Sequence, residues 1–101
     1  MVDRIPFPHP GETLREDFLK PLGLSAYRLA LDLHVPALRV REIMQGRRGI
    51  SADTALRLAR YFNTTPKFWL NLQVAYHLAK VSEARAAEID KTVSPRAAAM
   101  S

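Results

Sequence analysis

A chain of 101 residues, 48% of them hydrophobic, has enough material for one compact core and too little for two. It contains no cysteine, which excludes disulfides and thiolate metal sites, and its apolar stretches are too short and too interrupted to cross a bilayer. The net charge is +5, from 15 Lys and Arg against 10 Asp and Glu. The opening residues lack the continuous apolar segment of a secretory signal, so we expect a cytoplasmic protein.

Residues 1–9 contain two prolines and are expected to form an extended arm. Pro10 suits the first position of a helix, and Glu12 places a negative charge in its positive first turn. The segment HPGE around these two residues is interpreted only as a helix start. The helix is expected to end near Lys20, and Gly23 to reverse the chain. Its apolar stripe consists of Leu14, Phe18 and Leu19.

Residues 25–49, SAYRLALDLHVPALRVREIMQGRRG, are the stretch around which we expect the fold to be organised. Helical spacing predicts two short amphipathic helices, from about Ala26 to Leu33 and from about Pro36 to Gln45, joined by a tight turn. Ser25 suits an N-cap, and Pro36 suits the first helical position. The small Ala30 lets the two helices cross closely. The residues expected to face inward are Leu29, Ala30, Leu33, Val35, Val40, Ile43 and Met44.

The turn between these helices carries His34, where such motifs usually have glycine. Histidine is among the few other residues enriched at positive φ, so a left-handed turn remains feasible. The pattern is typical of a helix-turn-helix, whose second helix enters the major groove of DNA. The alternative is a generic helical hairpin whose arginines form an ordinary solvated face. The residues expected to face outward are Ala37, Leu38, Arg39, Arg41 and Gln45, followed by Arg47 and Arg48.

Most of the excess positive charge lies in and just after this motif. Between Ser25 and Arg60 there are seven arginines and three acids (Asp32, Glu42 and Asp53), a local charge of +4. Basic residues along one face suit a polyanion, and arginine suits bidentate contacts to phosphate or guanine.

Two further helices are expected after the motif. Ser51 should cap the first of them and Asn63 should end it in a left-handed conformation, while Thr65-Pro66 should start the second. The expected buried face of the helix after Ser51 consists of Ala55, Leu56, Leu58, Ala59 and Phe62.

The last helix has two apolar stripes on different sides, although a peripheral helix of a small monomer needs only one. The first stripe contains Phe68, Trp69, Leu72, Ala75, Tyr76 and Ala79, and the second contains Leu70, Val74, Leu78 and Val81. An exposed second stripe needs a partner, and a two-fold homodimer is the simplest one. The helix is expected to extend to about Asp90, with Pro95 beyond its end. The expected organisation is therefore an arm (residues 1–9), a helix-turn-helix domain (10–81), and a helix extension with a mobile tail (82–101).

Two segments resemble the HigA family of antitoxins, within the Xre-type helix-turn-helix regulators: HPGETLREDFLKPLGLSAYRLA and GRRGISADTALRLARYFNTTPKFWLNLQ. The resemblance covers about Pro8 to Leu78. It implies an all-α, five-helix domain of the lambda-repressor type that dimerises and binds a palindromic double-stranded operator. It also implies repression of the chain's own operon and neutralisation of a HigB-type toxin, an mRNA endonuclease. The second stripe of the last helix is then either the dimer seam or the groove that binds the toxin.

On this reading, each outward-facing residue has an expected DNA contact. Phosphates would be held by Ser25, Tyr27, Arg28, Arg47 and Arg48, base edges by Arg39, Arg41 and Gln45, and thymine methyl groups by Ala37 and Leu38. A stand-alone regulator, or a toxin-binding module that does not bind DNA, is the alternative. An enzyme is not expected, nor a cofactor or metal, because the three histidines lie in separate elements and no catalytic motif is present.

Overall fold

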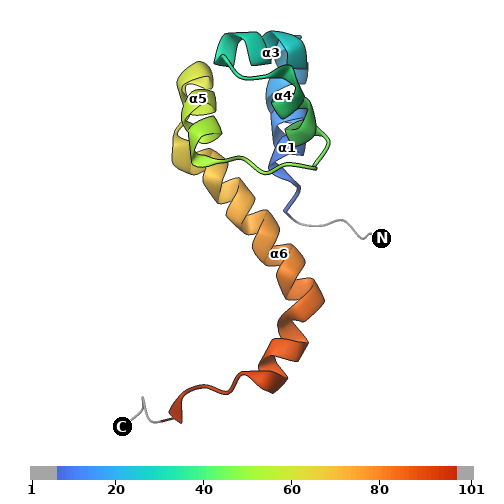
Figure 1. Cartoon of the computed structure of the whole chain (residues 1–101), viewed down its shortest axis with the longest axis vertical. Helices are drawn as coiled ribbons and strands as arrows, with labels where there is room; N and C mark the ends of the chain where they lie inside the picture. The colour runs from blue at the N-terminus through green and yellow to red at the C-terminus, as the bar shows by residue number, and fades with distance from the viewer. Residues whose placement is uncertain (1–6, 98–101) are drawn as a thin grey trace.

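The computed structural model describes residues 7–97, so most of the expected N-terminal arm and the end of the expected tail lie outside the described residues. Those residues contain helices and no strand, and the predicted all-α class is confirmed (Figure 1). Five helical rods can be distinguished, of which the first is built from three consecutive segments. The segments are α1 (Pro10–Thr13), the π-helix η1 (Leu14–Leu19), α2 (Lys20–Leu22), α3 (Ala26–Leu33), α4 (Ala37–Met44), α5 (Ala52–Phe62) and α6 (Pro66–Thr92).

The helix starts follow the capping residues in the sequence. The hydroxyl oxygens of Ser25, Ser51 and Thr65 accept hydrogen bonds from backbone N–H groups three residues later, at 3.0, 3.2 and 3.1 Å. Pro36 departs from the prediction by one position. It precedes α4 with ψ 142°, because the chain is still turning there, and the helix begins at Ala37.

The turn of the predicted motif has the left-handed geometry expected from His34, whose φ and ψ are 61° and 46°. The N–H of Val35 donates to the Ala30 carbonyl at 3.1 Å and so closes the end of α3. Asn63 ends α5 in the same conformation, with φ 58°. Both predictions of a left-handed residue other than glycine are confirmed.

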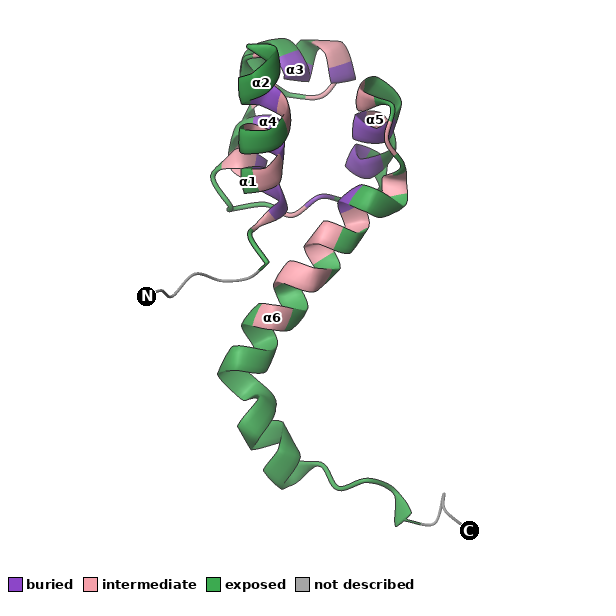
Figure 2. Ribbon diagram, turned by 180° about the vertical axis from the view of Figure 1, so that it is seen from behind, coloured by how far each residue is buried: buried purple, intermediate pink, exposed green. Residues whose placement is uncertain are grey.

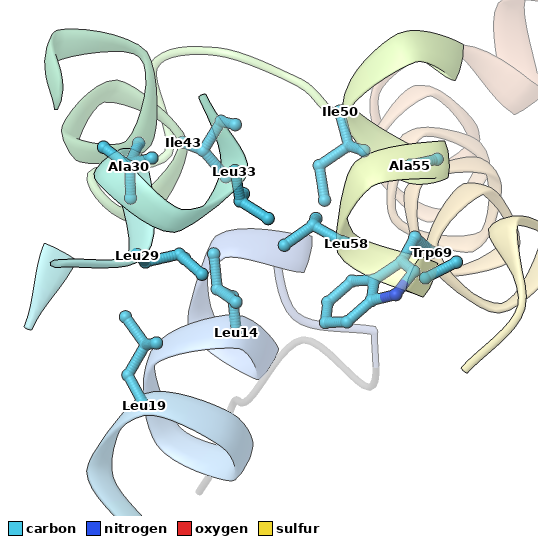
Figure 3. Packing of buried hydrophobic residues seen from close by; sticks show 12 residues of the cluster. Leu14, Leu19, Leu29, Ala30, Leu33, Ile43, Ile50, Ala55, Leu58 and Trp69 are labelled. Carbon is cyan, nitrogen blue, oxygen red and sulfur yellow. The ribbon is translucent and has the colours of Figure 1, made fainter. Parts of the chain in front are cut away.

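The core gathers one buried face from each helical rod, and Figure 3 shows Leu14 of η1, Leu29 of α3 and Leu58 of α5 converging. Trp69 of α6 is fully buried, and its indole N–H donates to the Thr64 hydroxyl at 2.8 Å. The prediction that Leu56 is buried was wrong: its side chain is 60% exposed and lines a surface hollow between α5 and the C-terminal end of α3. Figure 2 shows burial concentrated in the upper, compact part of the chain.

Gly11 lets the first rod approach α4 more closely than any other residue would. A Cβ at this position would overlap the backbone carbonyl of Ile43. Next to this contact, the Arg15 guanidinium donates to the Met44 carbonyl at 3.0 Å and so satisfies an open acceptor at the end of α4. The segment HPGE is therefore more than a helix start, because it fixes the position of the second motif helix.

α6 is 27 residues long, slightly longer than predicted, and only its first half packs on the body of the protein. From Val81 onward every residue of the helix is exposed. Figures 1 and 2 show this half projecting from the compact part. Among residues 7–97, no helix combines the length and the apolar composition that a bilayer crossing needs.

Replacing Gly11 with alanine should cost about 3 kcal/mol of unfolding free energy, because the methyl group meets a backbone carbonyl that cannot move aside. Gly23→Ala is the matched control. Gly23 has φ +62° but open space around its Cα, so alanine there should cost only about 1 kcal/mol. Urea denaturation of both variants measures the difference, and equal losses would show that the close approach is not important.

Candidate nucleic-acid interface

The outer face of α4 is formed by Leu38, Arg41 and Gln45. All three are exposed, Leu38 to 53%, and their spacing places them on one side of the helix. Ala37, predicted to face outward, is instead half-buried and packs against the core. Arg39 also lies at the edge of this face, with 32% of its side chain exposed. The helix predicted over about Pro36 to Gln45 is present as α4, but its exposed face contains fewer residues than predicted.

Arg39 is directed toward the start of α5. Its Nη1 lies 3.6 Å from Oδ2 of Asp53, whose closer partner is Arg57 at 2.9 Å. The hydrogen bond from Arg57 lowers the pKa of Asp53, with a smaller contribution from the positive charge of Arg39. Asp53 therefore stays ionised at neutral pH and links the second motif helix to α5.

The other arginines near the motif differ in whether they have an acidic partner. Arg28 pairs with Asp32 at 3.2 Å and Arg48 with Glu42 at 2.9 Å. Arg41 and Arg47 make no salt bridge within the described part of the chain. Exposed salt bridges of this kind contribute only about 0–1 kcal/mol to stability. Arg28 and Arg48 can therefore exchange their carboxylate partner for a phosphate at little cost.

Arg57 also positions the first motif helix, which the sequence analysis did not anticipate. Its Nη1 donates to the Leu33 carbonyl at 2.8 Å, at the C-terminus of α3. Together with the Arg15 contact at Met44, arginines from outside the motif cap both motif helices at their C-termini. Arg57 was counted in the sequence only as one of the seven arginines near the motif, because its contact to Leu33 depends on the fold.

Gln73 of α6 holds the segment that follows α4, which we call the GRRG loop (residues 46–49). Its amide accepts from the Ile50 N–H at 2.9 Å and donates to the Ile50 carbonyl at 3.2 Å. Gly49 makes room for this amide, since a Cβ there would lie 2.6 Å from Nε2 of Gln73. This role of Gln73 was not predicted from the sequence, because it depends on backbone atoms 23 residues away.

The two stripes of α6 differ in burial. Trp69, of the first stripe, is fully buried in the core. The second stripe, which we call the apolar seam (Leu70, Val74, Leu78 and Val81), is mostly exposed. Val74, Leu78 and Val81 are 54%, 63% and 52% exposed, whereas Leu70 is half-buried and packs against the core.

The exposed residues around α4 form a polar, positively charged surface. No group of three potential metal ligands is found among residues 7–97. Exposed arginines and hydroxyl groups lie at the ends of the two motif helices, in the GRRG loop and at the start of α5.

Comparisons with known proteins agree with this geometry. A family model described as helix-turn-helix matches residues 16–69. Virulence-associated protein I of Dichelobacter nodosus is 57% identical over 76 residues, which are 75% of this chain and 70% of that protein. The solved structure of Pseudomonas aeruginosa antitoxin HigA with the higBA promoter has a TM-score of 0.85 and 45% identity, covering 88% of this chain and 97% of that one.

Antitoxin GraA in complex with its operator is similar to the same degree, with a TM-score of 0.86 and 43% identity over 95% of this chain and 97% of that one. The family model spans more than half of the sequence, and the structural matches span nearly all of the described fold. The chain belongs to the HigA family of antitoxins, within the helix-turn-helix regulators.

Proposed function

We propose that this chain is an antitoxin that binds the operator of its own operon, represses transcription from it and neutralises a toxin encoded beside it. The observation that carries the DNA-binding part is the outer face of α4, where Leu38, Arg41 and Gln45 are exposed between flanking arginines. The solved relatives that were captured with a promoter or an operator support the same role. Membership of this family of DNA-binding regulators also agrees with the expectation that the chain is not an enzyme.

In the proposed complex, α4 lies in the major groove. Arg41 and Gln45 read base edges, and Leu38 contacts a thymine methyl group. Arg39 reaches the rim of the groove by leaving Asp53, which still has Arg57 as its partner. Phosphate contacts come from the start of α3 and from the GRRG loop; they are made by Ser25, Tyr27, Arg28, Arg47 and Arg48.

The proposed operator complex contains a homodimer that meets along the apolar seam. Three large apolar side chains of the seam are more than half exposed on a helix whose second half projects from the body. Burying such a surface against a second copy removes it from water and gives the two recognition helices a fixed separation. That separation should be about 34 Å, or a multiple of it, to match successive turns of a palindromic site.

The toxin partner is proposed from the relatives described as antitoxins. The expected partner is the product of an adjacent open reading frame, a HigB-type mRNA endonuclease. Expression of that product alone should arrest growth, and co-expression of this chain should restore it. Arrest that this chain does not relieve would leave a stand-alone transcriptional regulator as the function.

Arg41→Ala should reduce discrimination between the operator and an unrelated duplex by roughly 1–3 kcal/mol, because it removes a contact to a base edge. Arg47→Ala should weaken binding to both duplexes alike and reduce the salt slope by about 1, because it removes a contact to phosphate. Binding titrations of both variants over a salt series separate the two roles. Identical behaviour of the two variants would contradict the assignment.

Val74→Lys should shift the protein from dimer to monomer, because the substitution puts a charge into the proposed seam. Sedimentation velocity measures the change. Ala87→Lys is the control, since it adds the same charge at an exposed position on another side of α6. A Val74→Lys protein that remains fully dimeric would exclude this seam.

A further inference from the structure

We infer that a groove between the GRRG loop and α6 binds a phosphate of the DNA backbone and so makes α6 part of the DNA-binding surface. This inference rests on the proposed function. The cavity has a volume of about 360 Å³ and is lined by residues of three separate parts of the chain. We call it the basic groove; its lining is His9, the GRRG loop (residues 46–49), Tyr76, His77, Lys80 and Val81.

The composition of the basic groove suits an anion. Arg47, Arg48 and Lys80 contribute positive charge, and two imidazoles add hydrogen-bonding nitrogens, while none of the lining residues is acidic. Arg48 pairs with Glu42 at 2.9 Å, but half of its side chain remains exposed. Arg47 has no salt bridge among the described residues, so its charge is available in the groove.

His9 is held in one orientation by the start of the first helix. Its Nδ1 accepts a hydrogen bond from the Gly11 N–H at 2.9 Å, so the proton of the neutral imidazole resides on Nε2, which is a donor. Burial lowers the pKa of His9, and His77 and Lys80 lower it further, which favours this neutral form. His9 therefore contributes a fixed donor to the basic groove.

Tyr76 orders the opposite wall. Its ring meets His9 edge to face, with centroids 4.9 Å apart and an interplanar angle of 77°. The Lys80 ammonium lies 5.6 Å from the centroid of the same ring, within the range of a cation–π interaction. This contact holds the positive charge of Lys80 over the basic groove, although the residue is exposed.

The position of the basic groove identifies the anion as DNA phosphate. Two of the cationic residues that line it belong to the GRRG loop, which directly follows the proposed recognition helix. Gln73 binds the backbone of Ile50 at 2.9 and 3.2 Å, and so joins the end of that loop to α6 about one turn before His77 and about two turns before Lys80. When the GRRG loop lies on the duplex backbone, these α6 residues are therefore held beside the same strand.

Lys80→Gln tests the inference, and Lys91→Gln is the matched control, since it removes the same charge from α6 about 16 Å further along the helix. Loss of one phosphate contact should lower the affinity for operator and unrelated duplex alike, roughly fivefold at 0.15 M salt, and reduce the salt slope by about 0.9. Lys91→Gln should leave both quantities unchanged. Equal behaviour of the two variants would overturn the inference, and would point to an acidic protein as the occupant.

A second measurement locates the contact. Operators that carry a single neutral methylphosphonate in place of each phosphate in turn should include one that weakens the wild-type protein more than Lys80→Gln, because Lys80 is one of the cations expected to contact that phosphate. If no position behaves in this way, the inference is wrong. Sedimentation of Lys80→Gln should show an unchanged oligomer, and dissociation would instead assign Lys80 to the subunit interface.

Failure of the proposed function would be distinguishable from failure of this inference. A wild-type protein that does not prefer its operator over unrelated duplex would refute the function itself. An operator-specific wild type whose affinity does not depend on Lys80 would refute only the basic groove.

Discussion

The absence of a side chain at Gly11 is the constraint on which the placement of α4 depends. The first rod rests directly on the backbone of Ile43, and Arg15 from the same rod completes the end of α4. A second arginine, Arg57, does the same for α3 and is held by Asp53. The outer face of α4 is therefore presented by a rigid support, which matters because base contacts are sensitive to small displacements.

The electrostatics of this surface combine fixed and exchangeable charges. Arg28 and Arg48 have acidic partners on their own or a neighbouring element, and Arg39 is close to one. In this structure these carboxylates lie beside the guanidinium groups. Because all of them are partly exposed, their loss costs little when phosphates replace the carboxylates. Arg41 and Arg47, in contrast, have no acidic partner within the described residues that a phosphate would have to replace.

Local chemistry allowed much of the fold to be predicted from sequence. Ser25, Ser51 and Thr65 cap helices because their hydroxyls reach an N–H group three residues later, and His34 and Asn63 end helices in the left-handed region. Tertiary contacts account for the differences. The exposure of Leu56 and the burial of Ala37 depend on which helices lie nearby, and the roles of Gly11 and Gln73 depend on backbone atoms far away in sequence.

The double hydrogen bond between Gln73 and Ile50 has a mechanical consequence. It fixes the backbone directly after the GRRG loop to the packed half of α6, while the far half of α6 projects from the body. The projecting half continues the same helix away from this point of attachment. We therefore expect a tilt of α6 to shift the GRRG loop as well, because the Gln73 amide attaches the backbone after this loop to the helix.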